Sequence, residues 1–137
     1  MGLRRLPTDF DILNAIYERY YETFASFTKE KPNRSAKIFV PIDIDALARD
    51  MRVDGDIVFG RLYYHLENRY GYMKDDGSLV HLFALKVGDD GHCINFPYAG
   101  SVLASLRDEN RKYRTATAVA VVSLVVAAVS LCISIIR

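Results

Sequence analysis

Four polar side chains share one face of a helix that the sequence predicts after residue 56. Arg61, Tyr64, His65 and Asn68 are spaced so that an α-helix places them on the same side. Side chains of these types are common partners of DNA phosphates and of base edges. Arg49, on the preceding predicted helix, adds a further phosphate contact. We interpret these five residues as a recognition face, either for duplex DNA or for a protein.

The charge of the chain favours a protein partner over DNA. All 17 acidic residues and 17 of the 18 basic residues precede Thr115, so this part of the chain is formally neutral. Affinity for phosphate comes chiefly from Lys and Arg. Acidic pairs lie at the predicted helix start, in Asp54 and Asp56, and in a predicted loop, in Asp89 and Asp90. Duplex DNA is therefore a partner that we keep open and do not favour.

The other reactive residues indicate structural roles. The three histidines lack the spacing of a metal site, and the aspartate pairs lie at predicted turns and helix starts, where Asp is favoured. Cys93 has no obvious activating neighbour, and the sequence contains no phosphate-binding loop or nucleophile motif. We therefore expect no metal, no cofactor and no enzymatic activity.

A long apolar segment at the C-terminus predicts a membrane helix. Residues 115–136 are 22 residues without a charge, and as a helix they span roughly 33 Å, which matches a hydrocarbon core of about 30 Å. Four basic residues precede the segment and only Arg137 follows it, so the positive-inside rule places the N-terminal part in the cytosol. The flanking residues are Arg107, Arg111, Lys112 and Arg114. We expect a tail-anchored, single-pass protein inserted after translation, with a bacterial inner membrane preferred.

Small residues recur along the apolar segment with the period of a left-handed helix pair. They follow one another at steps of four and three residues, and small residues mark helix contacts in lipid because they allow backbones to approach closely. The seam consists of Ala116, Ala120, Ser123, Ala127, Ser130 and Ser134. We hypothesise that the membrane helix self-associates through this seam, which makes the protein a homo-oligomer.

The segment before the tail has the pattern of a small α+β domain. We expect a capped helix over residues 8–29, a strand over 37–41, two helices separated by a turn at 53–56, and a hairpin formed by strands 79–87 and 92–96. A helix from Tyr98 then runs toward the tail. The predicted divisions are a domain over 1–97, a basic juxtamembrane segment over 98–114 and the membrane helix over 115–136.

This order of elements resembles a winged helix-turn-helix domain. The resemblance covers roughly residues 8–97 and depends on the segment from Ile44 to Val53, in which Leu47, Ala48 and Met51 fit the spacing of a helix-turn-helix core. Arg52 occupies a position where glycine is common in the family, and Leu62 lies one residue later than the usual apolar position. The resemblance implies three helices, a small antiparallel sheet with a hairpin wing, and a use either in DNA binding or in protein interaction.

Tyrosine is unusually frequent, with nine in the chain, and seven lie on or near the first and third predicted helices. Such side chains suit a half-buried core or a protein interface. We expect a core role for Tyr20 and Tyr70, and the interface role stays open for Tyr17, Tyr21 and Tyr64. The favoured function is a regulatory module that binds an unidentified cytosolic or membrane protein. The alternatives are a membrane-anchored DNA-binding regulator and a small oligomeric effector that perturbs the bilayer.

Overall fold

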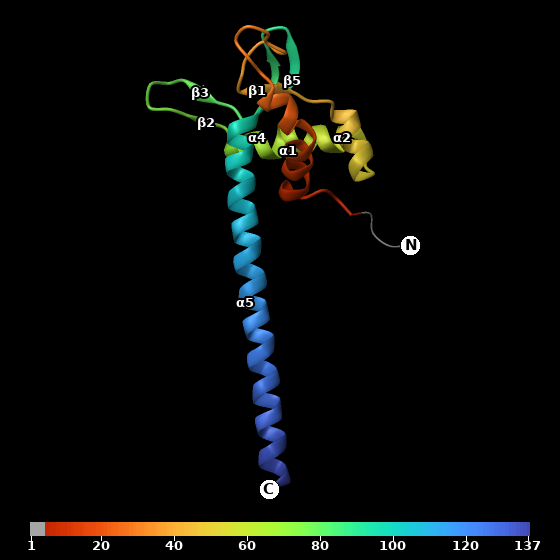
Figure 1. Ribbon diagram of the computed structural model, residues 1–137, viewed down its shortest axis with the longest axis vertical. Helices are drawn as coiled ribbons and strands as arrows, with labels where there is room; N and C mark the ends of the chain where they lie inside the picture. The colour runs from red at the N-terminus through yellow and green to blue at the C-terminus, as the bar shows by residue number, and fades with distance from the viewer. Residues whose placement is uncertain (1–4) are drawn as a thin grey trace. The chain divides into compact units, whose positions relative to one another are not determined.

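The computed structural model describes residues 5–137, and their contacts divide the chain into two units, Met1–Leu103 and Ala104–Arg137. The first unit is α+β and the second is helical, as predicted (Figure 1). The elements of the first unit, in chain order, are α1 (Asp9–Ala25), β1 (Phe39–Pro41), α2 (Ile44–Met51), α3 (Gly55–Gly60), η1 (Arg61–Leu66), α4 (Glu67–Tyr70), β2 (Tyr72–Met73), β3 (Leu79–Val80), β4 (Phe83–Val87) and β5 (Asp90–Asn95). Helix α5 (Phe96–Ile136) follows.

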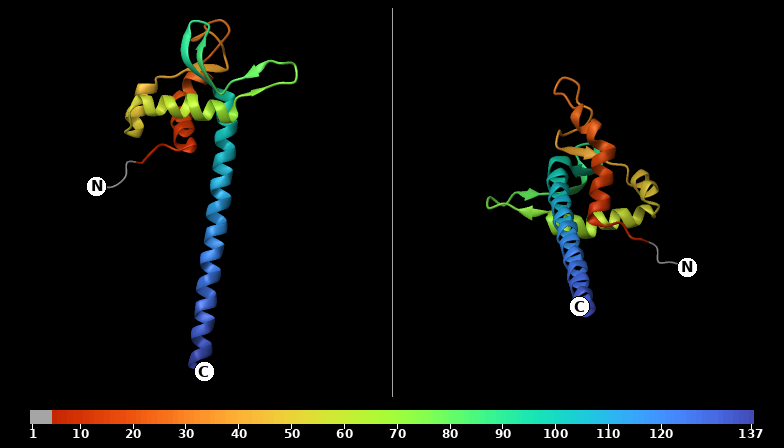
Figure 2. Two further views of the ribbon diagram at one scale, coloured as in Figure 1. Left: turned by 180° about the vertical axis from the view of Figure 1, so that it is seen from behind. Right: turned by 60° about the horizontal axis from the view of Figure 1, so that its bottom comes forward.

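Two small antiparallel sheets accompany the helices. The first has the order β1-β5-β4, with Val40 opposite Ile94 and Phe83 opposite the same residue on its other side. The second consists of β2 and β3 alone. Figures 1 and 2 show that the β2–β3 hairpin and the β4–β5 hairpin project from the first unit in different directions.

The core between these elements contains apolar side chains from each of the longer helices and from the three-stranded sheet. The largest fully buried side chains are Ile12, Leu13, Ile16, Leu47, Leu62, Leu66, Leu82, Ile94 and Leu103. Leu103 belongs to α5, so the first two turns of that helix complete the core of the first unit.

Helix α1 begins at the predicted capping box and ends earlier than predicted. The Asp11 N–H donates to Thr8 Oγ1 at 3.1 Å, and the Thr8 N–H donates to the Asp11 carboxylate at 2.9 Å. The predicted end near residue 29 is wrong, because the helix stops at Ala25. The buried Arg34 guanidinium donates to the carbonyls of Thr23 and Phe24, so the last carbonyls of α1 are bound by a side chain instead of by a further helical turn.

The turn after α2 is made without a glycine. Arg52 has φ +58°, which is the left-handed conformation that commonly ends a helix. Its N–H donates to the Arg49 carbonyl at 3.2 Å, and the next N–H, from Val53, donates to the Ala48 carbonyl at 3.0 Å. The chain therefore makes the turn with an arginine at the position where a glycine is common.

Residues 55–70 form one continuous helix with an unusual middle. From Arg61 to Leu66 the backbone is π-helical, and the Glu67 N–H bonds to the Leu62 carbonyl five residues back. An α-helix turns about 100° per residue, so side chains four residues apart drift by about 40°. The wider π turn reduces that drift and keeps Val58, Leu62 and Leu66 fully buried on one face.

The predicted strand over 79–87 is wrong in one respect, because the structure splits it into β3 and β4. At the break, the N–H groups of Leu82 and of Phe83, the first residue of β4, donate to the Glu67 carboxylate at 2.8 and 2.7 Å. β3 pairs with β2, which the sequence did not predict as a strand. The predicted loop over 88–91 is shorter, because Val87 already pairs with Asp90 across Gly88 and Asp89.

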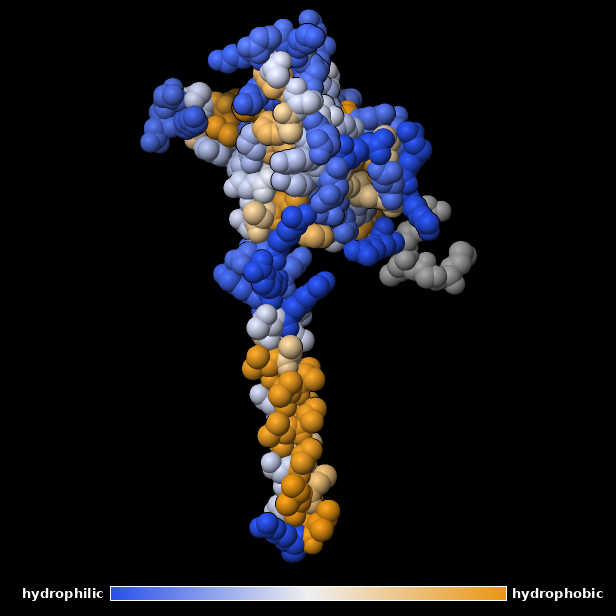
Figure 3. Space-filling model, viewed as in Figure 1, coloured by the Kyte–Doolittle hydropathy of each residue, from blue (hydrophilic) through white to orange (hydrophobic). Residues whose placement is uncertain are grey.

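Helix α5 confirms the predicted continuous helix from the domain into the apolar tail, and it begins two residues before Tyr98. Its residues from Ala104 onward make up the second unit. Among residues 5–137, α5 is the one helix long and apolar enough to cross a membrane, and none of its apolar stretch is buried against the protein. Figure 3 shows apolar side chains along this stretch and hydrophilic residues at both of its ends.

Candidate functional site

Three basic or imidazole side chains of the 55–70 helix meet a single carboxylate at the start of α1. Arg61 Nη2 binds Asp9 Oδ1, His65 Nε2 lies 3.2 Å from the same oxygen, and Arg69 Nη1 lies 3.0 Å from Asp9 Oδ2. The Asp9 side chain is only 12% exposed. Within the described residues, Arg61 Nε is the one buried side-chain nitrogen or oxygen atom without a protein hydrogen-bond partner. We call Asp9, Arg61, His65 and Arg69 the Asp9 cluster.

The π-helical segment explains how one carboxylate reaches three partners. Arg61, His65 and Arg69 are spaced by four residues, and on an ideal α-helix they would spread over about 80°. The wider turn of η1 holds them closer to one line, facing the N-terminus of α1. Asp9 also lies in the first turn of α1, where a negative charge is favoured by the helix dipole.

The predicted recognition face is therefore divided into parts. Arg61 and His65 turn toward Asp9, whereas Tyr64 and Asn68 line an open groove on the neighbouring side of the helix. Arg49 is exposed on α2 and belongs to neither group. The structure also places Arg69, which lies outside the predicted recognition face, in the Asp9 cluster.

The groove lies between the 55–70 helix and the β2–β3 hairpin and has a volume of about 480 Å³. Its walls are rich in aromatic and apolar side chains that project into solvent. Tyr64, Met73 and Leu79 are 73%, 66% and 59% exposed. The helix side is lined by Tyr63, Tyr64, Glu67, Asn68 and Gly71, and the hairpin side by Tyr72, Met73, Leu79, Val80 and His81. We call this surface the tyrosine groove. In Figure 3 the hairpin wall of the groove is the orange area between the blue tip of the hairpin on the left and the rest of the domain.

Glu67 fixes the base of the tyrosine groove. Its carboxylate accepts the backbone N–H groups of Leu82 and Phe83, and His81 Nδ1 lies 2.8 Å from its other oxygen. Gly71 follows one turn later, where an added Cβ would lie 2.7 Å from the Glu67 carbonyl oxygen. A side chain at this position would collide with the backbone, so glycine allows the chain to leave the helix for β2.

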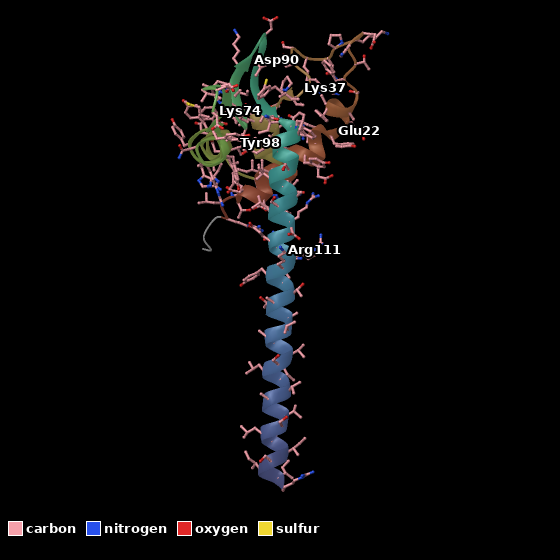
Figure 4. The ribbon with its side chains drawn as sticks, turned by 90° about the vertical axis from the view of Figure 1, so that its left-hand side faces the viewer. Glu22, Lys37, Lys74, Asp90, Tyr98 and Arg111 are labelled. Atoms are coloured by element: carbon pink, nitrogen blue, oxygen red, sulfur yellow. The ribbon has the colours of Figure 1, made fainter. Side chains whose placement is uncertain are left out.

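Tyr98 at the start of α5 supports the hairpin from beneath (labelled in Figure 4). Its hydroxyl donates to the Tyr70 carbonyl at 2.7 Å, and its ring meets that of Tyr72 edge to face with centroids 6.1 Å apart. Burial raises the pKa of the Tyr98 hydroxyl, and the neighbouring Tyr72, Tyr70 and Glu67 raise it further. The hydroxyl therefore stays a neutral hydrogen-bond donor at physiological pH.

The acidic residues of the β4–β5 hairpin serve the fold. The Asp90 carboxylate accepts the Ser35 N–H at 2.7 Å, and the Ser35 hydroxyl accepts the Asp89 N–H at 3.2 Å. Burial lowers the pKa of the nearby Arg34 guanidinium, and Asp90 partly opposes that shift. The tip of this hairpin is thereby attached to the loop between α1 and β1.

Two features of this site leave no recognisable pattern in the sequence. The β2–β3 hairpin has strands of two residues, which are too short for an alternation of apolar and polar residues to be visible. The pairing of Asp9 with Arg61 joins residues more than 50 positions apart, so it leaves no local signal. A four-residue repeat of Arg61, His65 and Arg69 was the available indication.

In the second unit, the seam residues and the basic flank lie on exposed helix. On an α-helix the seam from Ala116 to Ser134 falls within a stripe about 80° wide. Lys112 pairs with Asp108 at 3.1 Å, one turn earlier.

No protein-family model, curated protein or solved structure matches this chain.

Proposed function

We propose that this chain is a membrane-anchored interaction module that binds another protein through the tyrosine groove. One observation carries the proposal: the arginines of the 55–70 helix are bound to Asp9, while its neighbouring exposed side is aromatic. Aromatic side chains with polar ends are enriched at protein interfaces, whereas phosphate affinity needs available Lys and Arg. A groove with exposed Tyr64, Met73 and Leu79 fits the first requirement.

The anchor in this proposal is the apolar part of α5. A soluble protein that exposed such a long apolar helix would aggregate, whereas in lipid every backbone group of a helix is satisfied internally. The excess of basic residues before Thr115 supports a cytosolic location for the first unit. The small-residue stripe supports self-association of the membrane helix.

We further propose a winged-helix-like architecture for the first unit. The order of helices and strands, the turn between α2 and α3, and the β1-β5-β4 sheet with its β4–β5 hairpin all support it. The hairpin β2–β3, inserted between the third helix and the sheet, is an addition to that plan and supplies one wall of the groove.

A membrane-anchored DNA-binding regulator remains the second candidate, and the same architecture favours it. In such domains the helix at 55–70 would enter the major groove of DNA. Arg61 and His65 would then have to leave Asp9, and the largely buried carboxylate would lose two of its three partners and keep only Arg69. The protein-binding function requires no such rearrangement.

Site-specific photo-crosslinking in cells tests the proposal. A photoreactive phenylalanine analogue replaces Tyr64 in the full chain, and the same analogue at Lys86, an exposed position on β4, is the matched control. We expect a discrete protein adduct at Tyr64 and none at Lys86. Absence of a Tyr64 adduct, or adducts of the same mass from both positions, would overturn binding at the groove.

A further inference from the structure

The β2–β3 hairpin is a sheet of only two strands. Tyr72 pairs with Val80 and Met73 with Leu79, and no third strand joins them among the described residues. An isolated two-stranded hairpin is marginally stable in water, and independent stability usually needs three or more strands with an apolar face. This hairpin therefore lacks the additional strands that usually stabilise a sheet.

The outer edge of β2 carries backbone N–H and C=O groups that point away from β3. The Lys74 N–H donates to the Ser78 carbonyl at 2.8 Å across the hairpin. Because backbone groups alternate in direction along a strand, the N–H and C=O of Met73 point away from β3. An edge of this kind is a template for pairing with another strand.

We propose that two copies of this chain pair through their β2 edges and form one four-stranded antiparallel sheet of order β3-β2-β2-β3. A two-fold axis at Met73 places this residue opposite its own copy, where the two residues exchange both N–H···O bonds. The pairing needs no rearrangement of the hairpin, because the outward groups of Met73 already face the added strand.

The side chains are self-complementary in this register. Met73 and Leu79 are register partners and share one face of the hairpin, so the dimer sheet carries an unbroken row of Leu79, Met73, Met73 and Leu79. On the other face, Lys74 of each copy lies opposite Tyr72 of the second copy, where its ammonium group meets an aromatic ring. An arbitrary partner strand would have to supply both features, whereas a second copy has them already.

The area that the interface buries indicates the conditions under which the two copies pair. Tyr72, Met73 and Leu79 are 52%, 66% and 59% exposed, which amounts to about 350 Å² per copy at roughly 200 Å² for a large side chain. The pair thus buries about 700 Å², below the roughly 1,200 Å² of stable complexes. Anchoring in one membrane raises the effective concentration, so the inference depends on the membrane anchor of the proposed function. Pairing is expected in a bilayer and not at low concentration in detergent.

Cysteine crosslinking of the full chain in vesicles tests this pairing. Cys132 is changed to Ser, which leaves the buried Cys93 as the remaining native thiol. Met73→Cys is then compared with Lys86→Cys, which lies on β4, one of the two edge strands of the other sheet. After reconstitution in phosphatidylcholine vesicles and a short bismaleimide, we expect most of the Met73→Cys chains as dimers and only a minor fraction of the Lys86→Cys chains.

A second substitution separates sheet pairing from crowding by the membrane helix. Pro replaces Tyr72 in the Met73→Cys background, and near-ultraviolet circular dichroism verifies that the domain stays folded. Tyr72→Pro should reduce the dimer yield several-fold, because it removes the N–H that faces β3 beside Met73 and so disrupts the strand that the pairing needs. Equal yields for Met73→Cys and Lys86→Cys, or a yield unchanged by Tyr72→Pro, would overturn the β2 pairing.

The two proposals fail in different ways. A Tyr64 photo-adduct whose mass is not twice that of the chain, together with no Met73→Cys dimer, would overturn the second copy and leave the interaction module standing. If neither experiment gives an adduct, both proposals fall.

Discussion

Replacing Asp9 by Asn tests the central structural feature, the cluster in which one carboxylate holds three partners. The substitution keeps the size of the side chain and removes its charge. Asp9 is 12% exposed and bound to Arg61 and Arg69, so the loss concerns partly desolvated contacts. The charge-assisted bond to Arg61 loses about 1–2 kcal/mol, the more exposed Arg69 pair up to about 1 kcal/mol, and the helix-dipole contribution about 0.3–1 kcal/mol.

Together these losses lower the free energy of unfolding by about 2–3 kcal/mol. For a domain of this size the midpoint of thermal unfolding should fall by about 10–20 °C. Tyrosine circular dichroism in the near ultraviolet reports the first unit, and the full chain is measured in detergent micelles. Urea titration of the same samples gives the free energy directly.

Asp50→Asn is the matched control for Asp9→Asn. Asp50 pairs with Arg19 at 2.9 Å, but both side chains are largely exposed. Its substitution should change the free energy of unfolding by no more than about 0.5 kcal/mol. If Asp9→Asn and Asp50→Asn have equal effects on the free energy of unfolding, the Asp9 cluster does not stabilise the fold.

Three further predictions concern the groove, its support and the tail. Glu67→Ala should lower the free energy of unfolding by about 2–4 kcal/mol in urea titration, because the N–H groups of Leu82 and Phe83 lose a charged acceptor; a change below 1 kcal/mol would contradict this role. Tyr98→Phe should cost about 1 kcal/mol at neutral pH through the lost bond to the Tyr70 carbonyl. Because the pKa of Tyr98 is raised in the folded state, the stability that its hydroxyl contributes is present at neutral pH and is lost as pH rises above about 10. The difference in the free energy of unfolding between Tyr98→Phe and the unsubstituted protein should therefore become smaller at high pH. A difference that does not change with pH would refute this role of the hydroxyl. Changing Ala120 and Ala127 together to Leu should reduce crosslinked oligomers in membranes, and unchanged oligomers would eliminate the seam.

Local signals made much of the fold predictable. Thr8 and Asp11 form a capping box within four residues, and the adjacent Leu47 and Ala48 are buried on the core side of a short helix. The signal for the apolar tail is equally local, because a run of uncharged residues is sufficient to predict a membrane helix. Each of these features depends on neighbours in sequence, so a sequence pattern contains them.

Features that depend on distant partners could not be predicted in the same way. The end of α1 depends on Arg34, which binds its last carbonyls from the following loop. The break between β3 and β4 depends on a carboxylate of a preceding helix, that of Glu67. Nothing in the local sequence of either segment encodes these contacts.

The candidate site was half predictable for the same reason. Helical periodicity predicted Arg61, Tyr64, His65 and Asn68 as one face, whereas in the structure Arg61 and His65 contact Asp9 and Tyr64 and Asn68 line the groove. The π-helical segment changes the angle between these pairs, and Asp9 then fixes the first pair on the protein. A face that seemed basic and aromatic is thus divided into an internal ion cluster and an aromatic groove.

Binding of fluorescent random duplex DNA to the full chain in micelles tests the central claim most directly. Anisotropy is measured at low and at moderate salt, for the unsubstituted protein and for Asp9→Asn. With Arg61 and Arg69 bound to Asp9, the unsubstituted protein should show no salt-dependent binding, and any weak binding should appear only in Asp9→Asn. Micromolar binding by the unsubstituted protein that weakens steeply with salt would contradict the account and favour the DNA-binding regulator.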